Sequence, residues 1–143
     1  MKKLASLLLL AAPFPAASEV TYHRDIAPIV YANCAGCHRP GESAPFPLTS
    51  YAEVSRRAKT ISLVVNDRYM PPWHANPETT HFLDVRRLKA EEIATIDRWI
   101  ADGKPEGDPA DAPSFPTFTE GWQLGEPDLV LTMGAAYEVP AEG

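Results

Sequence analysis

Apolar residues recur at the spacing of an α-helix in three segments of the chain. In the first, residues 21–33, the apolar positions i, i+3 and i+4 are Ile26, Ile29 and Val30. We expect Asp25 to cap the N-terminus of this helix. Pro28 then lies in the first turn, where a missing N–H removes no internal hydrogen bond. The pattern predicts a short helix that buries one face.

The second helix is predicted to start at Ser50, because Glu53 three residues later completes a capping box. An apolar stripe follows at i, i+4, i+7 and i+11, formed by Val54, Ala58, Ile61 and Val65. The helix must stop before Met70, since two prolines come directly after that residue.

The third helix is predicted to start near Ala90 and to run over residues 91–101. Its apolar face consists of Ile93, Ile96 and Ile100, with Trp99 beside them. Gly103 fits the left-handed residue after a helix, and Pro105 prevents the helix from resuming. Before residue 120 no alternation of the strand type occurs, so the first hundred residues are expected to be all-α with irregular loops.

The sequence changes character after Pro105. Prolines recur every three to four residues, as in a stiff linker, and residues 128–133 and 137–139 then have the composition of short strands. We therefore expect a helical domain over residues 19–108. Residues 109–143 are expected to form a Pro-rich acidic linker and the start of a further β-rich domain. On this interpretation the chain is a fragment of a longer protein.

The first 18 residues match the three parts of a secretory signal peptide. A basic start at Lys2 and Lys3 precedes the run 4–12, which is apolar except for Ser6, and small residues then lead to Glu19. The alternatives are a buried helix or a membrane anchor, but nine residues are too few to cross a bilayer, which needs about 20. We expect residues 1–18 to be removed on export to the periplasm or the extracellular space. The mature chain is expected to contain no membrane span.

Composition and charge narrow the class of protein further. Of 143 residues 15 are proline, about twice the usual share, which predicts substantial irregular backbone. The formal net charge is −6, and residues 102–143 hold nine acidic side chains against Lys104 alone. No basic patch is available to neutralise phosphates, so a nucleic-acid partner is not expected. Solubility explains the acidic tail more simply than docking does.

Both cysteines of the chain lie in the sequence Cys34-Ala-Gly-Cys37-His38, the C-x-x-C-H spacing of covalent c-type haem attachment. Two thiols three positions apart can add to the two vinyl groups of one porphyrin, which places the adjacent histidine below the iron. Three alternatives are weaker. A thioredoxin-like site would lie in a βαβ pattern, and a zinc site would need further ligands. A plain disulfide remains open. We expect one haem c, held through Cys34 and Cys37, with His38 as an iron ligand.

Met70 is the favoured sixth ligand of the iron, because Pro71 and Pro72 stiffen the backbone directly after it. A thioether ligand also favours Fe(II). Alternatively, Met70 fills the core beside Trp73, as an average methionine does. The weaker candidates are His74, the alternative sixth ligand, followed by His81, His23 and Met133.

The motifs Cys34-Ala-Gly-Cys-His38, Met70-Pro-Pro-Trp73 and Trp99-Ile-Ala-Asp-Gly103 resemble those of a small class I c-type cytochrome domain. The resemblance implies three to four short helices around a covalent haem, in which helix 24–33 crosses helix 91–101 beside the cofactor. It also implies haem-binding roles for Cys34, Cys37, His38, Met70 and Trp73. Over residues 22–108 the chain is similar to the N-terminal cytochrome modules of large exported bacterial proteins that carry a copper, ascorbate-dependent-monooxygenase-like domain. No copper-binding His or Met cluster is present in the chain itself.

Two functions follow from these expectations. The first is single-electron transfer through a haem with His/Met axial ligation, which serves a fused domain or a redox partner protein. The chain itself would then be a carrier and not an enzyme. The second is a haem enzyme or ligand sensor of the peroxidase kind, in which the sixth position opens and His74 or His81 assists proton transfer.

Overall fold

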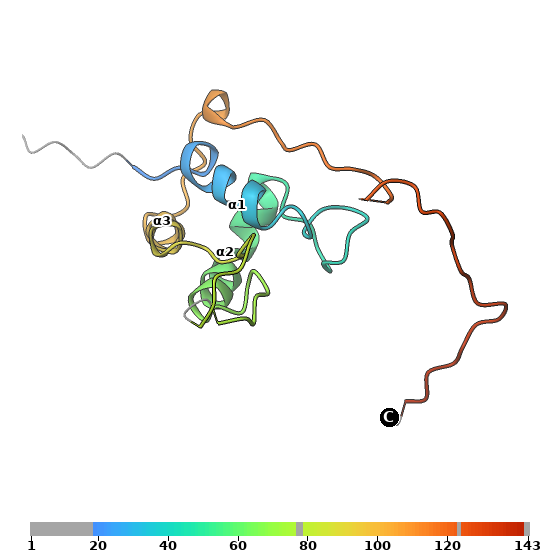
Figure 1. Cartoon of the computed structure of the whole chain (residues 1–143). Helices are drawn as coiled ribbons and strands as arrows, with labels where there is room; N and C mark the ends of the chain where they lie inside the picture. The colour runs from blue at the N-terminus through green and yellow to red at the C-terminus, as the bar shows by residue number, and fades with distance from the viewer. Residues whose placement is uncertain (1–18, 77–78, 123, 142–143) are drawn as a thin grey trace, which may run out of the picture.

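The computed structural model describes residues 19–76, 79–122 and 124–141. These residues contain five helical elements: η1 (Tyr22–Ile26), α1 (Ala27–Asn33), α2 (Tyr51–Asn66), α3 (Ala90–Ala101) and η2 (Pro109–Asp111). No strand is formed within these three ranges, so the expected all-α class is confirmed (Figure 1). The proposed signal peptide, residues 1–18, lies outside the described residues.

The first predicted helix is formed by η1 and α1, which follow one another without a break. The prediction that Asp25 caps this helix is wrong, because the helical backbone starts earlier, at Tyr22, and places Asp25 inside the first turn. The backbone N–H groups of Tyr22 and His23 are bound by the carbonyls of Pro105 and Glu106, at 2.9 and 3.1 Å, which satisfies the first turn. The Asp25 carboxylate instead accepts a hydrogen bond of 2.7 Å from the N–H of Thr21.

The predicted capping box of α2 is confirmed. The Ser50 side chain accepts from the N–H of Glu53, and the Glu53 carboxylate accepts from the N–H of Ser50 at 3.1 Å. The same carboxylate accepts from the N–H and the hydroxyl of Thr49. Burial opposes ionisation of Glu53, but these hydrogen bonds prevail and lower its pKa. All four members of the predicted apolar stripe are buried.

The helix α3 packs against η1 and α2. Its residues Ile93, Ile96 and Trp99 are buried, and Gly103 follows it with a φ of +90°, as predicted. Trp99, 1% exposed, lies beside Tyr22 and Tyr51 at ring-centroid distances of 6.1 and 6.5 Å. Its indole N–H donates to the Pro105 carbonyl at 2.9 Å, so the aromatic core and the chain beyond α3 are joined.

The first part of the tail, residues 109–118, packs back on the helical domain; we call it the docked tail. The Asp108 side chain caps η2, which contacts η1. Phe115 then meets Tyr31 of α1 edge to face, with ring centroids 4.9 Å apart. The Phe118 ring lies under the Arg39 guanidinium at 4.0 Å. This segment is therefore bound to the domain and is more than a linker.

The described residues of segment 119–141, which we call the exposed tail, extend away from the helices (Figure 1). Here the strand prediction fails within the chain: residues 128–133 and 137–139 form no strand. Leu131 is 84% exposed and its apolar neighbours are also exposed, because nothing pairs with this segment. A β-rich domain beyond it stays a prediction.

None of the helices in the described part of the chain combines the length and the apolar character that crossing a bilayer requires.

Candidate functional site

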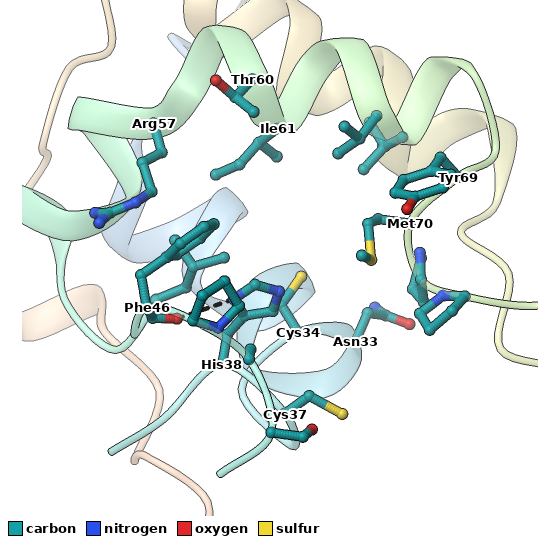
Figure 2. Close-up of a pocket in the computed structure, with 18 of the residues that line it drawn as sticks. Asn33, Cys34, Cys37, His38, Phe46, Arg57, Thr60, Ile61, Tyr69 and Met70 are labelled. Carbon is teal, nitrogen blue, oxygen red and sulfur yellow. Dashed lines mark hydrogen bonds between the residues drawn. The ribbon is translucent and has the colours of Figure 1, made fainter. Parts of the chain in front are cut away.

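A cavity of about 350 Å³ opens between the end of α1 and one face of α2 (Figure 2). Its walls are mainly apolar and come from five places: the end of α1 with the turn after it, the loop 43–48, the inner face of α2, the loop 69–72 and Arg86. Cys34, Cys37, His38 and Met70 all line it. The structure thus brings together four of the five residues that the sequence proposes for the cofactor. Of the described residues that line the cavity, none belongs to α3, although the resemblance places both terminal helices beside the haem.

The two cysteines lie on a turn that continues α1. The N–H of Cys34 donates to Val30, and the N–H groups of Cys37 and His38 both donate to the Cys34 carbonyl, at 3.1 and 2.8 Å. Both thiols are free, and no disulfide joins them. Cys37 is exposed at the mouth of the cavity, whereas burial, aided by the nearby Cys37, raises the pKa of Cys34 to about 12. Both thiols thus line the same cavity, with Cys34 more buried than Cys37.

The His38 imidazole is oriented by the loop that follows it. Its Nδ1 lies 3.0 Å from the carbonyl oxygen of Phe46 and donates to it, because a carbonyl can only accept. The two rings also lie against one another, with centroids 4.9 Å apart. Since Nδ1 carries the proton, Nε2 keeps its lone pair for a metal. This is the second-sphere arrangement that fixes the tautomer of a ligating histidine.

Met70 reaches the cavity from the far side, just beyond α2. The N–H groups of Tyr69 and Met70 both donate to the Val64 carbonyl, at 2.9 and 3.0 Å, which holds the chain against the end of the helix. Arg68, with a φ of +58°, makes the reversal that this requires. Figure 2 shows the Met70 thioether and the His38 ring facing the same open space from opposite sides.

The remaining candidates lie elsewhere. Trp73 is not among the residues that line the cavity; its ring packs against Phe82 at a centroid distance of 5.8 Å. His74 and His81 are exposed and do not line it either. His23 lies 3.5 Å from the Glu106 carboxylate, and Met133, in the exposed tail, is 72% exposed.

Sequence reasoning missed Phe46 and Arg57. Phe46 supplies the carbonyl that holds His38, and this role depends on the path of a loop that no spacing rule predicts. Arg57 lies four residues before Ile61, so both side chains are on the same face of α2. A charged residue beside the apolar stripe was therefore the signal that the sequence offered.

The chemistry of the pocket can be tested against a haem. Two free thiols, an imidazole with its Nε2 available and a thioether share apolar walls, and this is the donor set that a covalent haem with two axial ligands requires. A zinc site finds less support, because the described residues include no group of three or more His, Cys, Asp or Glu side chains that could hold a metal ion.

Comparisons with protein-family models, with curated proteins and with solved structures found no match for this chain.

Proposed function

We propose that this chain carries a covalently bound c-type haem and transfers single electrons. The observation that supports this most is the convergence of Cys34, Cys37, His38 and Met70 on one apolar cavity. Residues 34–38 and Met70 lie on separate segments, one on each side of α2 in the sequence. A haem in this cavity would supply an iron that alternates between Fe(III) and Fe(II).

Each cysteine has a defined part in this proposal. The two thiols would hold the cofactor through thioether bonds: each would add across one vinyl group and its proton would pass to the other vinyl carbon, so no electrons would be gained or lost overall. Cys37 would hold the cofactor at the exposed mouth of the cavity and Cys34 would hold it inside. The two bonds would fix it to the turn that carries His38.

The two proposed iron ligands, His38 and Met70, come from opposite sides of the cavity. His38 would bind the iron through Nε2, because Phe46 holds its Nδ1 proton. Met70 would supply a thioether ligand from the other side of the cavity and would favour the reduced state. The apolar walls exclude water, which lowers the local dielectric and limits reorganisation when the charge changes.

Electron transfer is favoured over the peroxidase-like alternative by the position of the histidines. His38 is the sole histidine among the described residues that line the cavity, and its Nδ1 proton is committed to Phe46. His74 and His81, the candidates for proton transfer, are exposed and away from the cavity. An open sixth position would therefore have no acid–base partner of this kind beside it.

The partner and the compartment belong to the same proposal. Haem attachment to C-x-x-C-H takes place after export, which agrees with the signal peptide predicted over residues 1–18. The electron partner is a redox protein or a domain downstream of the exposed tail.

The test is the absorption spectrum of the exported protein, with Met70→Ala as the variant and Met133→Ala as its control. We expect haem that stays attached after denaturation and a long-wavelength Met–Fe(III) band, lost in Met70→Ala and unchanged in Met133→Ala. A high-spin wild-type spectrum with ready cyanide binding would support the haem enzyme or sensor instead. A product without attached haem would overturn both functions.

A further inference from the structure

Arg57 has an unsatisfied donor at the wall of the cavity. The side chain extends from α2 and lines the cavity, and its guanidinium carbon lies 4.2 Å from the centroid of the Phe46 ring (Figure 2). Its Nη1 is buried and has no hydrogen-bond partner. A buried cationic N–H without an acceptor is costly, and such groups are rare unless a ligand or water completes them.

The described residues that line the cavity provide no anion beside Arg57. The charged or titratable side chains among the described lining residues are Cys34, Cys37, His38, Arg57, Tyr69 and Arg86. No carboxylate is among them. Glu53, one turn earlier on α2, is committed to Thr49 and Ser50 at the helix N-terminus. The acceptor left for Nη1 is therefore a ligand or a water molecule in the cavity.

Arg57 is also connected to His38 through a single residue. The guanidinium packs on the Phe46 ring, and the Phe46 carbonyl accepts the Nδ1 proton of His38. Any group that fixes the guanidinium also restrains the Phe46 ring and thus the backbone that orients the imidazole. The Arg57 guanidinium and the His38 imidazole are therefore linked through Phe46.

We propose that Arg57 binds a carboxylate of the cofactor through Nη1 and at the same time holds Phe46 in the position that orients His38. This rests on the proposed function, because the carboxylate is a propionate of the haem. Haem carries its propionates on an edge away from the vinyl groups, and Arg57 stands on α2, across the cavity from the turn with the two cysteines. Arg57 is a positioning residue for the imidazole and a binding residue for the acid.

Arg86 provides the matched control. It is a second arginine that lines the same cavity, but it is exposed. It also lines a polar hollow that includes Cys37, Arg39 and Glu42, at the cysteine side of the site. If any nearby cation were sufficient, Arg57 and Arg86 would be equivalent. The proposal requires them to differ.

The test uses the exported holoprotein and the variants Arg57→Gln, Arg57→Lys, Arg86→Gln and Phe46→Leu. The first readout is the resonance Raman bending band of the propionates, which responds to their hydrogen bonds. We expect a clear shift in Arg57→Gln, a smaller one in Arg57→Lys, and none in Arg86→Gln. The second is the reduction potential, which should fall in Arg57→Gln at both low and high salt, whereas the smaller effect of the exposed Arg86 should vanish with salt.

The link to His38 has its own readout, the exchange of the Nδ1 proton with water, measured by NMR in the reduced protein. Exchange should be several-fold faster in Arg57→Gln and in Phe46→Leu, while Phe46→Leu leaves the propionate band nearly unchanged. An unshifted band in Arg57→Gln, or equal shifts in Arg57→Gln and Arg86→Gln, would overturn the proposal. If Arg57→Gln yields no holoprotein, an unshifted band in Arg57→Lys overturns it. Haem missing from the wild-type protein would instead contradict the proposed function.

Discussion

The helical domain and the exposed tail differ in what happens to their apolar residues, although both contain prolines and irregular backbone. In the helical domain the loop after His38 contains three prolines, yet the backbone N–H of Leu48 donates to the His38 carbonyl at 2.9 Å and Leu48 is buried. In the exposed tail, apolar side chains such as Leu131 stay in solvent. An irregular segment becomes ordered where a helix face is available to receive its apolar residues.

The docked tail lies between these two extremes. It has the proline spacing of a linker, but two of its side chains contact the domain. Phe115 packs against the Tyr31 ring, and Phe118 packs against the Arg39 guanidinium. Two aromatic contacts are enough to direct the chain along α1 toward the cysteine turn. The docked tail thus contacts the helical domain as far as Phe118, and the domain boundary at residue 108 stays a prediction.

The largest difference between the regions should follow removal of the cofactor. We predict that Cys34→Ala with Cys37→Ala gives a poorly folded helical domain, because a domain this small depends on the haem as an apolar body to pack against. Circular dichroism should show most of the helical signal lost, while proteolysis within the exposed tail proceeds at the wild-type rate. Native-like helicity in the double variant would contradict this.

Truncation of one large side chain should change the free energy of unfolding far more in the helical domain than in the exposed tail. Trp99→Ala is expected to lower the free energy of unfolding by about 3–5 kcal/mol, because it leaves a cavity among Tyr22 and Tyr51. Leu131→Ala in the exposed tail should change it by less than about 0.5 kcal/mol. Denaturant unfolding of both variants measures the contrast, and similar losses would remove the distinction between the regions.

Two glycines with similar backbone conformation make a finer comparison. Gly107 has a φ of +81°, and a Cβ there would lie 2.6 Å from the Cβ of Thr21. Gly125, in the exposed tail, has a φ of +92° and no atom within 4 Å of the same position. Gly107→Ala should destabilise the domain by about 1–3 kcal/mol through strain and overlap. Gly125→Ala should leave its melting temperature unchanged, and equal effects would show that the contact with Thr21 is unimportant.

The smallest expected effect concerns the docked tail. Phe118→Ala should cost about 0.5–1 kcal/mol, because its cation–π contact with Arg39 lies at the protein surface, and should speed proteolysis within residues 109–118. Phe118→Trp retains an aromatic face for Arg39 and serves as the control. If Phe118→Ala is cleaved no faster than wild type, the docked tail is a linker after all.

Local signals in the sequence predicted the helices well. The capping box at Ser50 and Glu53 and the apolar stripe of α2 act within a few residues, so the pattern alone determines them. The C-x-x-C-H turn and Met70 were recognisable for the same reason, and the structure brings them to one cavity.

What the sequence did not predict depends on contacts between distant residues. The Phe46 carbonyl reaches His38, and Phe118 reaches Arg39, only because loops return to the helices. The cap of the first helix was wrongly predicted at Asp25, because Pro105 and Glu106, far along the chain, satisfy its first N–H groups instead. Residues 128–133 have the composition of a strand, but no second strand is available in the described chain for them to pair with.

The two hydrogen bonds that join Tyr22 and His23 to Pro105 and Glu106 bring the beginning and the end of the domain side by side. A domain whose ends are neighbours can be spliced into a surface loop of another protein without stretching the host. Tension on the exposed tail would first load the contacts of the docked tail, Phe118 with Arg39 and Phe115 with Tyr31, and only then these two hydrogen bonds. Because Arg39 directly follows His38, a pull on the exposed tail would reach the cysteine side of the cavity before it reached α2 or α3.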